Sequence, residues 1–126
     1  MSKSIMNDVA DAKSAVPSIS PEELIKVLGQ DNVLVVDVRD APELAGTGKV
    51  KGALNVSRGM LEFRADGTTK FHDARFSKDK MIVTYCSSGG RAALAAKALM
   101  DLGYRDVRRL GTISDWVDAG GEVEQP

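Results

Sequence analysis

Residues 81–103 read MIVTYCSSGGRAALAAKALMDLG, and this stretch decides the fold. Its first six residues are apolar and rich in β-branched side chains, which predicts a buried strand over 81–86. The alanine- and leucine-rich run that follows predicts a helix ending at Gly103. The apolar residues of that helix are Ala92, Leu94, Ala95, Ala98, Leu99 and Leu102. A buried strand that leads directly into a helix indicates a βαβ unit.

Three further stretches predict strands, and they alternate with helical or turn-rich segments. They are VLVVDVR at 33–39, ALNVS at 53–57 and DVRRL at 106–110. This alternation indicates an α/β fold with a mostly parallel sheet that helices cover on both faces. In such sheets a ligand binds beyond the carboxyl ends of the strands, which is where residues 86–91 fall.

Two more helices carry clear end signals. SISPEELIKVLG at 18–29 contains Ser20 as an N-cap, Glu23 as its capping-box partner and Gly29 as a stop. ISDWVDAGG at 113–121 predicts a last short helix.

Apolar residues at the start of the chain recur at spacings of four, three and four, which predicts an amphipathic helix. They are Ile5, Val9, Ala12 and Val16. We therefore expect residues 1–16 to form a helical extension that packs on a domain spanning residues 17–126. A frayed tail is the alternative.

Composition bounds the class of protein. The length of 126 residues suits one domain, and 43% hydrophobic with 28% charged residues is the balance of a soluble globular protein. The formal net charge of −1 gives no reason to expect nucleic acid or a membrane as partner. The single cysteine excludes an internal disulfide and a cysteine-cluster metal site. No secretory leader or membrane span is recognisable, so we expect the reducing cytoplasm as the location.

A run of small residues and an arginine follows the only cysteine, Cys86. They are Ser87, Ser88, Gly89, Gly90 and Arg91. Small residues let the backbone curl so that N–H groups point inward, and the start of the helix adds more of them. We therefore predict an anion-binding loop in which the N–H groups and Arg91 favour the thiolate of Cys86. The loop suits a persulfide, a phosphate or a thiosulfate-like dianion. An inert buried cysteine and a redox sensor are the alternatives.

Four stretches resemble, in order, motifs of the rhodanese-like superfamily. VVDVRD and ELAGTGKVKGALNVS resemble its Asp-Val-Arg strand and its Glu…Gly-His-Ile-x-Gly-Ala-x-Asn-Ile-Pro stretch. VTYCSSGGRAALAAKALMDLGYRDVRRL resembles the active-site strand, loop and helix, and GTISDWVDAGGEVE resembles the closing tryptophan-containing segment. The resemblance covers about residues 17–124 and indicates a single-domain rhodanese. It implies a three-layer α/β/α fold around a central, mostly parallel sheet of five strands.

The length of the loop separates two chemistries within this superfamily. Cys86 to Arg91 follows the pattern Cys-x4-Arg, with which rhodaneses hold a persulfide, whereas related cell-cycle phosphatases have Cys-x5-Arg and more room for phosphate. The resemblance therefore implies an enzyme of the thiosulfate:cyanide sulfurtransferase type. The Cys86 thiolate takes sulfur from a donor such as thiosulfate and passes it to cyanide, a thiol or a protein cysteine. We expect no cofactor and no metal.

The resemblance gives expected roles to residues around Cys86. We expect the loop residues 87–91 to bind substrate, with Arg91 as the cation of the loop. Some relatives that prefer thiosulfate carry a cation directly after the cysteine, where this chain has Ser87 and Ser88, so the natural donor stays open.

Three residues outside the loop also have expected roles. Arg58, in the RGMLEF stretch, is a candidate anion contact, with a solvated arginine as an equal alternative. Asp37 and Arg39 are expected to support the strand end, rather than to steer substrate.

Two other function classes stay open. A phosphatase or arsenate reductase could use the same scaffold, although the loop length argues against phosphate. A non-catalytic or regulatory domain that binds or relays sulfur is the other class, although the retained cysteine argues against it. The expected partners are a small-molecule sulfur donor and an acceptor, which is a thiol or an acceptor protein, and the chain is a monomer or a homodimer.

Overall fold

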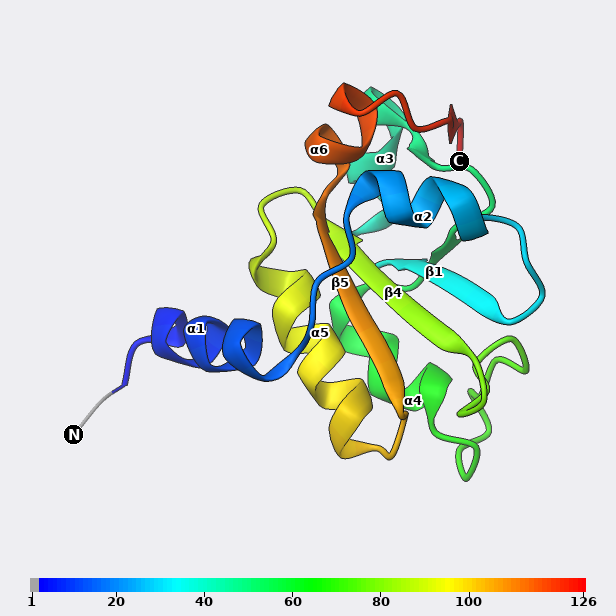
Figure 1. The fold of residues 1–126 in the computed structure, drawn as a ribbon. Helices are drawn as coiled ribbons and strands as arrows, with labels where there is room; N and C mark the ends of the chain where they lie inside the picture. Colours follow the sequence, from blue (N-terminus) through cyan, green and yellow to red (C-terminus); the bar gives the residue numbers. More distant parts are fainter. Residues whose placement is uncertain (1–2) are drawn as a thin grey trace.

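The protein has three layers, with a parallel sheet between two sets of helices (Figure 1). The structure is a computed structural model that describes residues 3–126. The central sheet has the order β3-β1-β4-β5, and every neighbouring pair is parallel. Its strands are β1 (Val33–Asp37), β3 (Leu54–Asn55), β4 (Met81–Cys86) and β5 (Asp106–Thr112). The predicted α/β class with a mostly parallel central sheet is confirmed.

Within residues 3–126 the central sheet has four strands, not the five expected. Beyond β5 the chain forms one isolated bridge, between Ser18 and Arg109. There Arg109 donates its N–H to the carbonyl of Pro17 and accepts the N–H of Ile19. Pro17 has no N–H with which to extend this ladder, and the helix that begins after Ser20 ends it on the other side. The edge segment is therefore too short to count as a strand.

Helices cover both faces of the sheet (Figure 1). The helices are α1 (Ile5–Ala15), α2 (Pro21–Val27), α3 (Leu44–Thr47), α4 (Leu61–Ala65), α5 (Gly90–Asp101) and α6 (Ile113–Asp118). Two 3-10 turns, η1 (Ala41–Glu43) and η2 (Arg58–Met60), precede α3 and α4. Side chains of α4 and α5 pack in one core, and those of α2 and α6 in the other. No helix within residues 3–126 has the length and apolar character needed to cross a membrane.

Strand β1 supplies both cores because successive side chains of a strand point to opposite faces. Leu34 and Val36 pack with α4 and α5, whereas Val35 packs with α2 and α6. Burial on both faces explains why the β1 sequence is continuously apolar.

The predicted helix signals are confirmed where they are strongest. The Ser20 hydroxyl accepts the Glu23 N–H at 3.0 Å, and the Glu23 carboxylate accepts the Ser20 N–H at 3.1 Å. Gly29 follows α2 with φ of 88°, and Gly103 follows α5 with φ of 99°. Both glycines adopt the left-handed conformation that ends helices.

An antiparallel ribbon completes the fold and was not predicted. It pairs β2 (Lys49–Val50) with β6 (Val123–Glu124). The Lys49 ammonium binds Glu124 at 2.6 Å across the ribbon. Strands of two residues show no alternation, so the sequence carries no signal for them.

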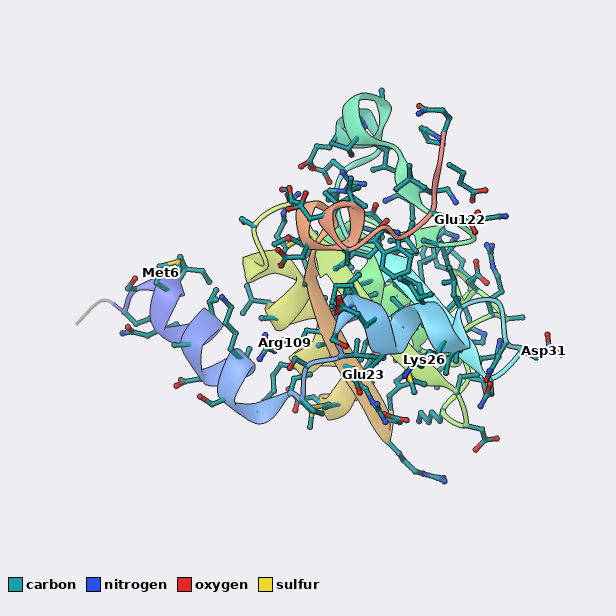
Figure 2. All side chains as sticks on the ribbon, turned by 45° about the horizontal axis from the view of Figure 1, so that its top comes forward. Met6, Glu23, Lys26, Asp31, Arg109 and Glu122 are labelled. Atoms are coloured by element: carbon teal, nitrogen blue, oxygen red, sulfur yellow. The ribbon has the colours of Figure 1, made fainter. Side chains whose placement is uncertain are left out.

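The N-terminal helix α1 packs on α5, as the apolar stripe predicts. Val9 and Ala12 are buried against Ala93, whereas Ile5, the first residue of the stripe, is 59% exposed. Figure 2 shows Met6 at the end of α1 that lies away from the sheet. Residues 1 and 2 of the predicted extension lie outside the described residues. The division of the chain between residues 16 and 17 stays a prediction.

A buried ion pair holds the end of β1. Asp37 and Arg39 are 0% and 1% exposed, and Arg39 Nη2 lies 2.6 Å from Asp37 Oδ2. Arg39 also donates to the Thr47 hydroxyl at 2.7 Å and to the Gly48 carbonyl at 2.9 Å. The hydrogen bond with Asp37 raises the pKa of Arg39. These contacts tie the segment around α3 to the edge of the sheet that carries the loop.

We predict that Arg39→Met lowers the free energy of unfolding by about 3–5 kcal/mol, because it leaves the Asp37 carboxylate buried without its partner. Urea unfolding measures the loss. The control is Arg108→Met, which removes a partly exposed pair with Asp106 at the same sequence spacing and should cost less than about 1 kcal/mol. Equal losses in the two variants would contradict a buried structural role for Arg39.

Candidate active site

Cys86 is the last residue of β4, and its loop leads directly into α5. Gly89 is the N-cap of α5 and has φ of 95°, a conformation that residues with a side chain rarely adopt. This turn brings the first amides of α5 back over the end of β4. Cys86 and Gly89 are buried, whereas Ser87 and Ser88 are exposed.

The Cys86 sulfur replaces a conventional helix cap. Sγ accepts the N–H of Gly89 at 3.0 Å and the N–H of Ala92 at 3.4 Å. Helix α5 has no other side-chain cap at its N-terminus, so these amides would otherwise lack a partner. The same amides and the positive end of α5 stabilise negative charge on sulfur.

The predicted loop cation, Arg91, is held by an acidic residue from another segment. Its guanidinium donates two hydrogen bonds to the Glu43 carboxylate, at 2.8 and 2.9 Å, and a third to the Ser87 hydroxyl at 3.0 Å. The pair raises the pKa of Arg91. The Arg91 hydrogen bonds, together with the Asp40 N–H, lower the pKa of Glu43 to about 2. Arg91 thus fixes the loop, with its charge largely compensated.

Glu43 is the residue of this site to which the sequence analysis assigned no role. It belongs to η1, whose capping box with Asp40 fixes the direction of its side chain. The sequence shows that Glu43 follows a turn, but its separation of 48 residues from Arg91 hides the pair.

Arg58 makes its hydrogen bond and ion pair with a residue outside the Cys86 loop. Its guanidinium binds Glu62 at 2.6 Å, one helical turn further along the chain. It lines a groove between α1, α4 and α5 together with Leu94 and Ala98. No hydrogen bond or ion pair in the described part of the chain joins Arg58 to Cys86 or to residues 87–91.

Arg39 lies beside Tyr85, the residue that precedes Cys86 in β4. The Arg39 guanidinium lies 5.7 Å from the centre of the Tyr85 ring, and the Tyr85 hydroxyl accepts the N–H of Val50. Burial raises the pKa of Tyr85, which keeps its hydroxyl protonated.

No group of three or more histidine, cysteine or acidic residues in residues 3–126 is arranged to hold a metal.

Curated proteins similar to this chain include some named sulfurtransferase and some named tRNA uridine(34) hydroxylase. A tRNA uridine(34) hydroxylase of Cytophaga hutchinsonii is 31% identical and a thiosulfate sulfurtransferase of Pseudomonas aeruginosa is 31% identical, over 94% and 87% of this chain. The chain spans 38% and 45% of those two proteins. A sulfurtransferase of Allochromatium vinosum is 32% identical over 88% of this chain and 97% of its own length.

Two solved structures are similar to most of this chain. A protein of unknown function from Rhodopseudomonas palustris, described as a possible tyrosine phosphatase, is 35% identical with a TM-score of 0.89, covering 98% of this chain and 96% of that one. A human single-domain sulfurtransferase is 30% identical with a TM-score of 0.69, covering 82% and 96%. The sequence model of the Rhodanese-like domain matches residues 20–119. The family model covers the strand, loop and helix around Cys86, and the relatives match most of the chain. The chain therefore belongs to the rhodanese-like domain family.

Proposed function

We propose that the protein is a sulfurtransferase that carries sulfane sulfur as a persulfide on Cys86. One observation carries the proposal: Sγ of the only cysteine lies within a six-residue loop and accepts two backbone N–H groups. Relatives named sulfurtransferase support it, among them one that this chain matches over almost its full length. The proposed donor is thiosulfate or a similar compound, and the proposed acceptor is cyanide, a thiol or a protein cysteine.

The chemistry has two steps, and this chain supplies the nucleophile for the first. The Cys86 thiolate attacks the outer sulfur of thiosulfate, a new S–S bond forms, and the old S–S bond breaks as its electron pair leaves with sulfite. The acceptor then attacks the outer sulfur of the persulfide. Cyanide leaves as thiocyanate, and Cys86 returns to the thiolate.

The loop provides charge stabilisation for both steps. The amides of Gly89 and Ala92 already bind Sγ, and in this proposal they stabilise the negative charge on sulfur during both steps. In this proposal residues 87–91 form the substrate-binding loop, and Arg91 acts through its pair with Glu43 by holding Ser87 and the loop backbone. A contact between Arg58 and substrate is the weakest part of the expected site because Arg58 is paired with Glu62.

Entry of a donor requires movement near Cys86, which has no exposed surface. The exposed residues Ser87 and Ser88 form the outer wall of the loop. Neither hydroxyl donates to another residue in the described part of the chain, although Arg91 binds the Ser87 oxygen. A small displacement of this wall would open the path to sulfur.

A phosphatase is the second candidate because the similar protein from Rhodopseudomonas palustris is described as a possible tyrosine phosphatase. The Cys-x4-Arg loop argues against it, since a phosphate needs more room and a free arginine. Here Arg91 is engaged by Glu43.

The relatives named tRNA uridine(34) hydroxylase are relevant to the partners of this protein and not to the chemistry of its Cys86 loop. This chain spans 38% of the protein from Cytophaga hutchinsonii, so the activity named for that protein is not part of this proposal. A non-catalytic role in binding or relaying sulfur would use the same Cys86 loop without turnover.

We propose a reducing compartment such as the cytoplasm, where the free thiol persists.

We predict that wild-type protein gains the mass of one sulfur atom after thiosulfate and loses it after cyanide, with thiocyanate formed. Cys86→Ser should show neither, because a serine hydroxyl forms no persulfide. Intact-protein mass spectrometry measures the adduct, and circular dichroism checks that the variant is folded. Ser18→Ala, an exposed serine outside the loop, is the control and should keep the adduct. Sulfur transfer by folded Cys86→Ser would rule out the covalent mechanism.

We predict that Glu43→Gln destabilises the protein at pH 6 and that its difference from wild type shrinks as the pH falls from about 4.5 to about 2. Pairing with Arg91 lowers the pKa of Glu43 to about 2 in the folded state from a usual value of 4.5, so the stabilisation exists above 4.5 and is lost as the carboxylate is protonated. Thermal unfolding across this pH range measures the difference. Glu122→Gln, which breaks an exposed pair with Lys51, should show little effect. A difference independent of pH would contradict the role of the Glu43 charge.

We predict that wild-type protein does not hydrolyse p-nitrophenyl phosphate. A variant with one glycine inserted after Gly89 has the Cys-x5-Arg length and is the matched comparison. Release of p-nitrophenol by the wild type, absent in Cys86→Ser, would favour the phosphatase.

A further inference from the structure

Helix α1 lies against the Cys86 loop, and its single lysine, Lys13, reaches Gly89, whose N–H binds the Cys86 sulfur. A Cβ atom placed on Gly90 would lie 3.7 Å from Cγ2 of Val9, and a Cβ atom placed on Gly89 would lie 4.0 Å from Nζ of Lys13. The Gly89 N–H is 3.0 Å from Sγ of Cys86. With the covalent bonds of Gly89 added, these distances place Nζ at most about 10 Å from Sγ.

The Lys13 ammonium has no partner of its own. Within residues 3–126, no hydrogen bond or ion pair involves its Nζ, and only its backbone carbonyl accepts a hydrogen bond, from Arg109. The other cation at the loop, Arg91, donates two hydrogen bonds to the Glu43 carboxylate. The uncompensated positive charge beside the loop is therefore that of Lys13.

The position of Lys13 is fixed by the end of α1. Arg109 of β5 donates to the carbonyls of Lys13 and Val16, at 3.1 and 3.2 Å. Figure 2 shows Arg109 beside this end of α1. Val9 and Ala12 hold the rest of the helix on Ala93 in α5. The backbone of Lys13 is thus anchored, while its exposed side chain is free to bind a ligand at the loop.

We propose that Lys13 binds the anionic head group of the sulfur donor, so that helix α1 forms part of the active site. This inference rests on the proposed function and adds the class of donor, a sulfane sulfur compound with a sulfonate or carboxylate group. The outer sulfur of the donor faces Sγ, and its anionic group faces Nζ. With thiosulfate, the ammonium stabilises the charge that gathers on sulfite as the S–S bond breaks. It supplies the cation that residues 87 and 88 lack.

The test compares two reagents that alkylate Cys86 by the same reaction and differ in one charge. Iodoacetate is anionic and iodoacetamide is neutral, and Cys86 is the only cysteine, so the mass of the protein reports this site alone. The rate ratio of the two reagents measures attraction of an anion to the site. The variants are Lys13→Gln, Lys13→Arg and the control Lys26→Gln on the exposed face of α2. The value of kcat/KM for thiosulfate is measured on the same proteins.

We expect Lys13→Gln to lower both the iodoacetate-to-iodoacetamide ratio and kcat/KM for thiosulfate by about fivefold to tenfold. Lys13→Arg should restore most of both, and Lys26→Gln should change neither. The iodoacetamide rate itself should stay constant, because Lys13 is exposed and its loss leaves the loop in place.

Two results would overturn the inference and leave the proposed function standing. One is an unchanged ratio in folded Lys13→Gln, and the other is an equal fall in Lys26→Gln, which would indicate a general field. A wild-type protein that is alkylated normally but takes no sulfur from thiosulfate or from an organic persulfide would instead overturn the proposed function.

Discussion

The hydrogen bonds from the Gly89 and Ala92 amides to Sγ of Cys86 are the contacts on which the site depends. They join the end of β4 to the start of α5 and give the first turn of that helix its acceptor. One sulfur atom therefore has two tasks, as a structural cap and as the proposed nucleophile. The left-handed turn at Gly89 makes both possible.

Charge around this cap is arranged in layers. The innermost positive groups are the N–H dipoles of Gly89 and Ala92, which belong to the backbone and bind Sγ directly. Arg91 lies further out, and Glu43 compensates it while it anchors the Ser87 hydroxyl. Lys13 lies on a separate helix and has no acidic partner among residues 3–126. This order separates the groups that shape the loop from the group available to a ligand.

Much of the fold could be predicted because the decisive signals are local. The apolar runs at 33–37 and 81–86, the capping box of Ser20 and the helix stop at Gly103 each depend on neighbours in sequence. The fifth strand expected from the family resemblance is absent because Pro17 and the start of α2 leave a single bridge. The ribbon of β2 and β6 was missed because two residues show no period.

The candidate site divides in the same way. Cys86 and its glycine-rich loop are contiguous in sequence, so their geometry could be predicted from residue types alone. Glu43, which pairs with Arg91, and Lys13, which lies beside Gly89, come from segments that only the folded chain brings together. Arg58 shows the opposite case, since its place after a strand suggested the site and its partner is Glu62 on its own helical turn.

Helix α1 docks on α5 beside the Cys86 loop, but other elements hold the backbone of that loop. The loop backbone is held by β4, α5 and the Glu43–Arg91 pair, none of which belongs to residues 3–16. Sequence change at exposed positions of α1, such as Lys13, can therefore alter the surface beside the sulfur without disturbing the amides that bind it. The residues of α1 that face the loop can therefore vary, in evolution or by design, and change which molecules approach Cys86 while the loop itself stays the same.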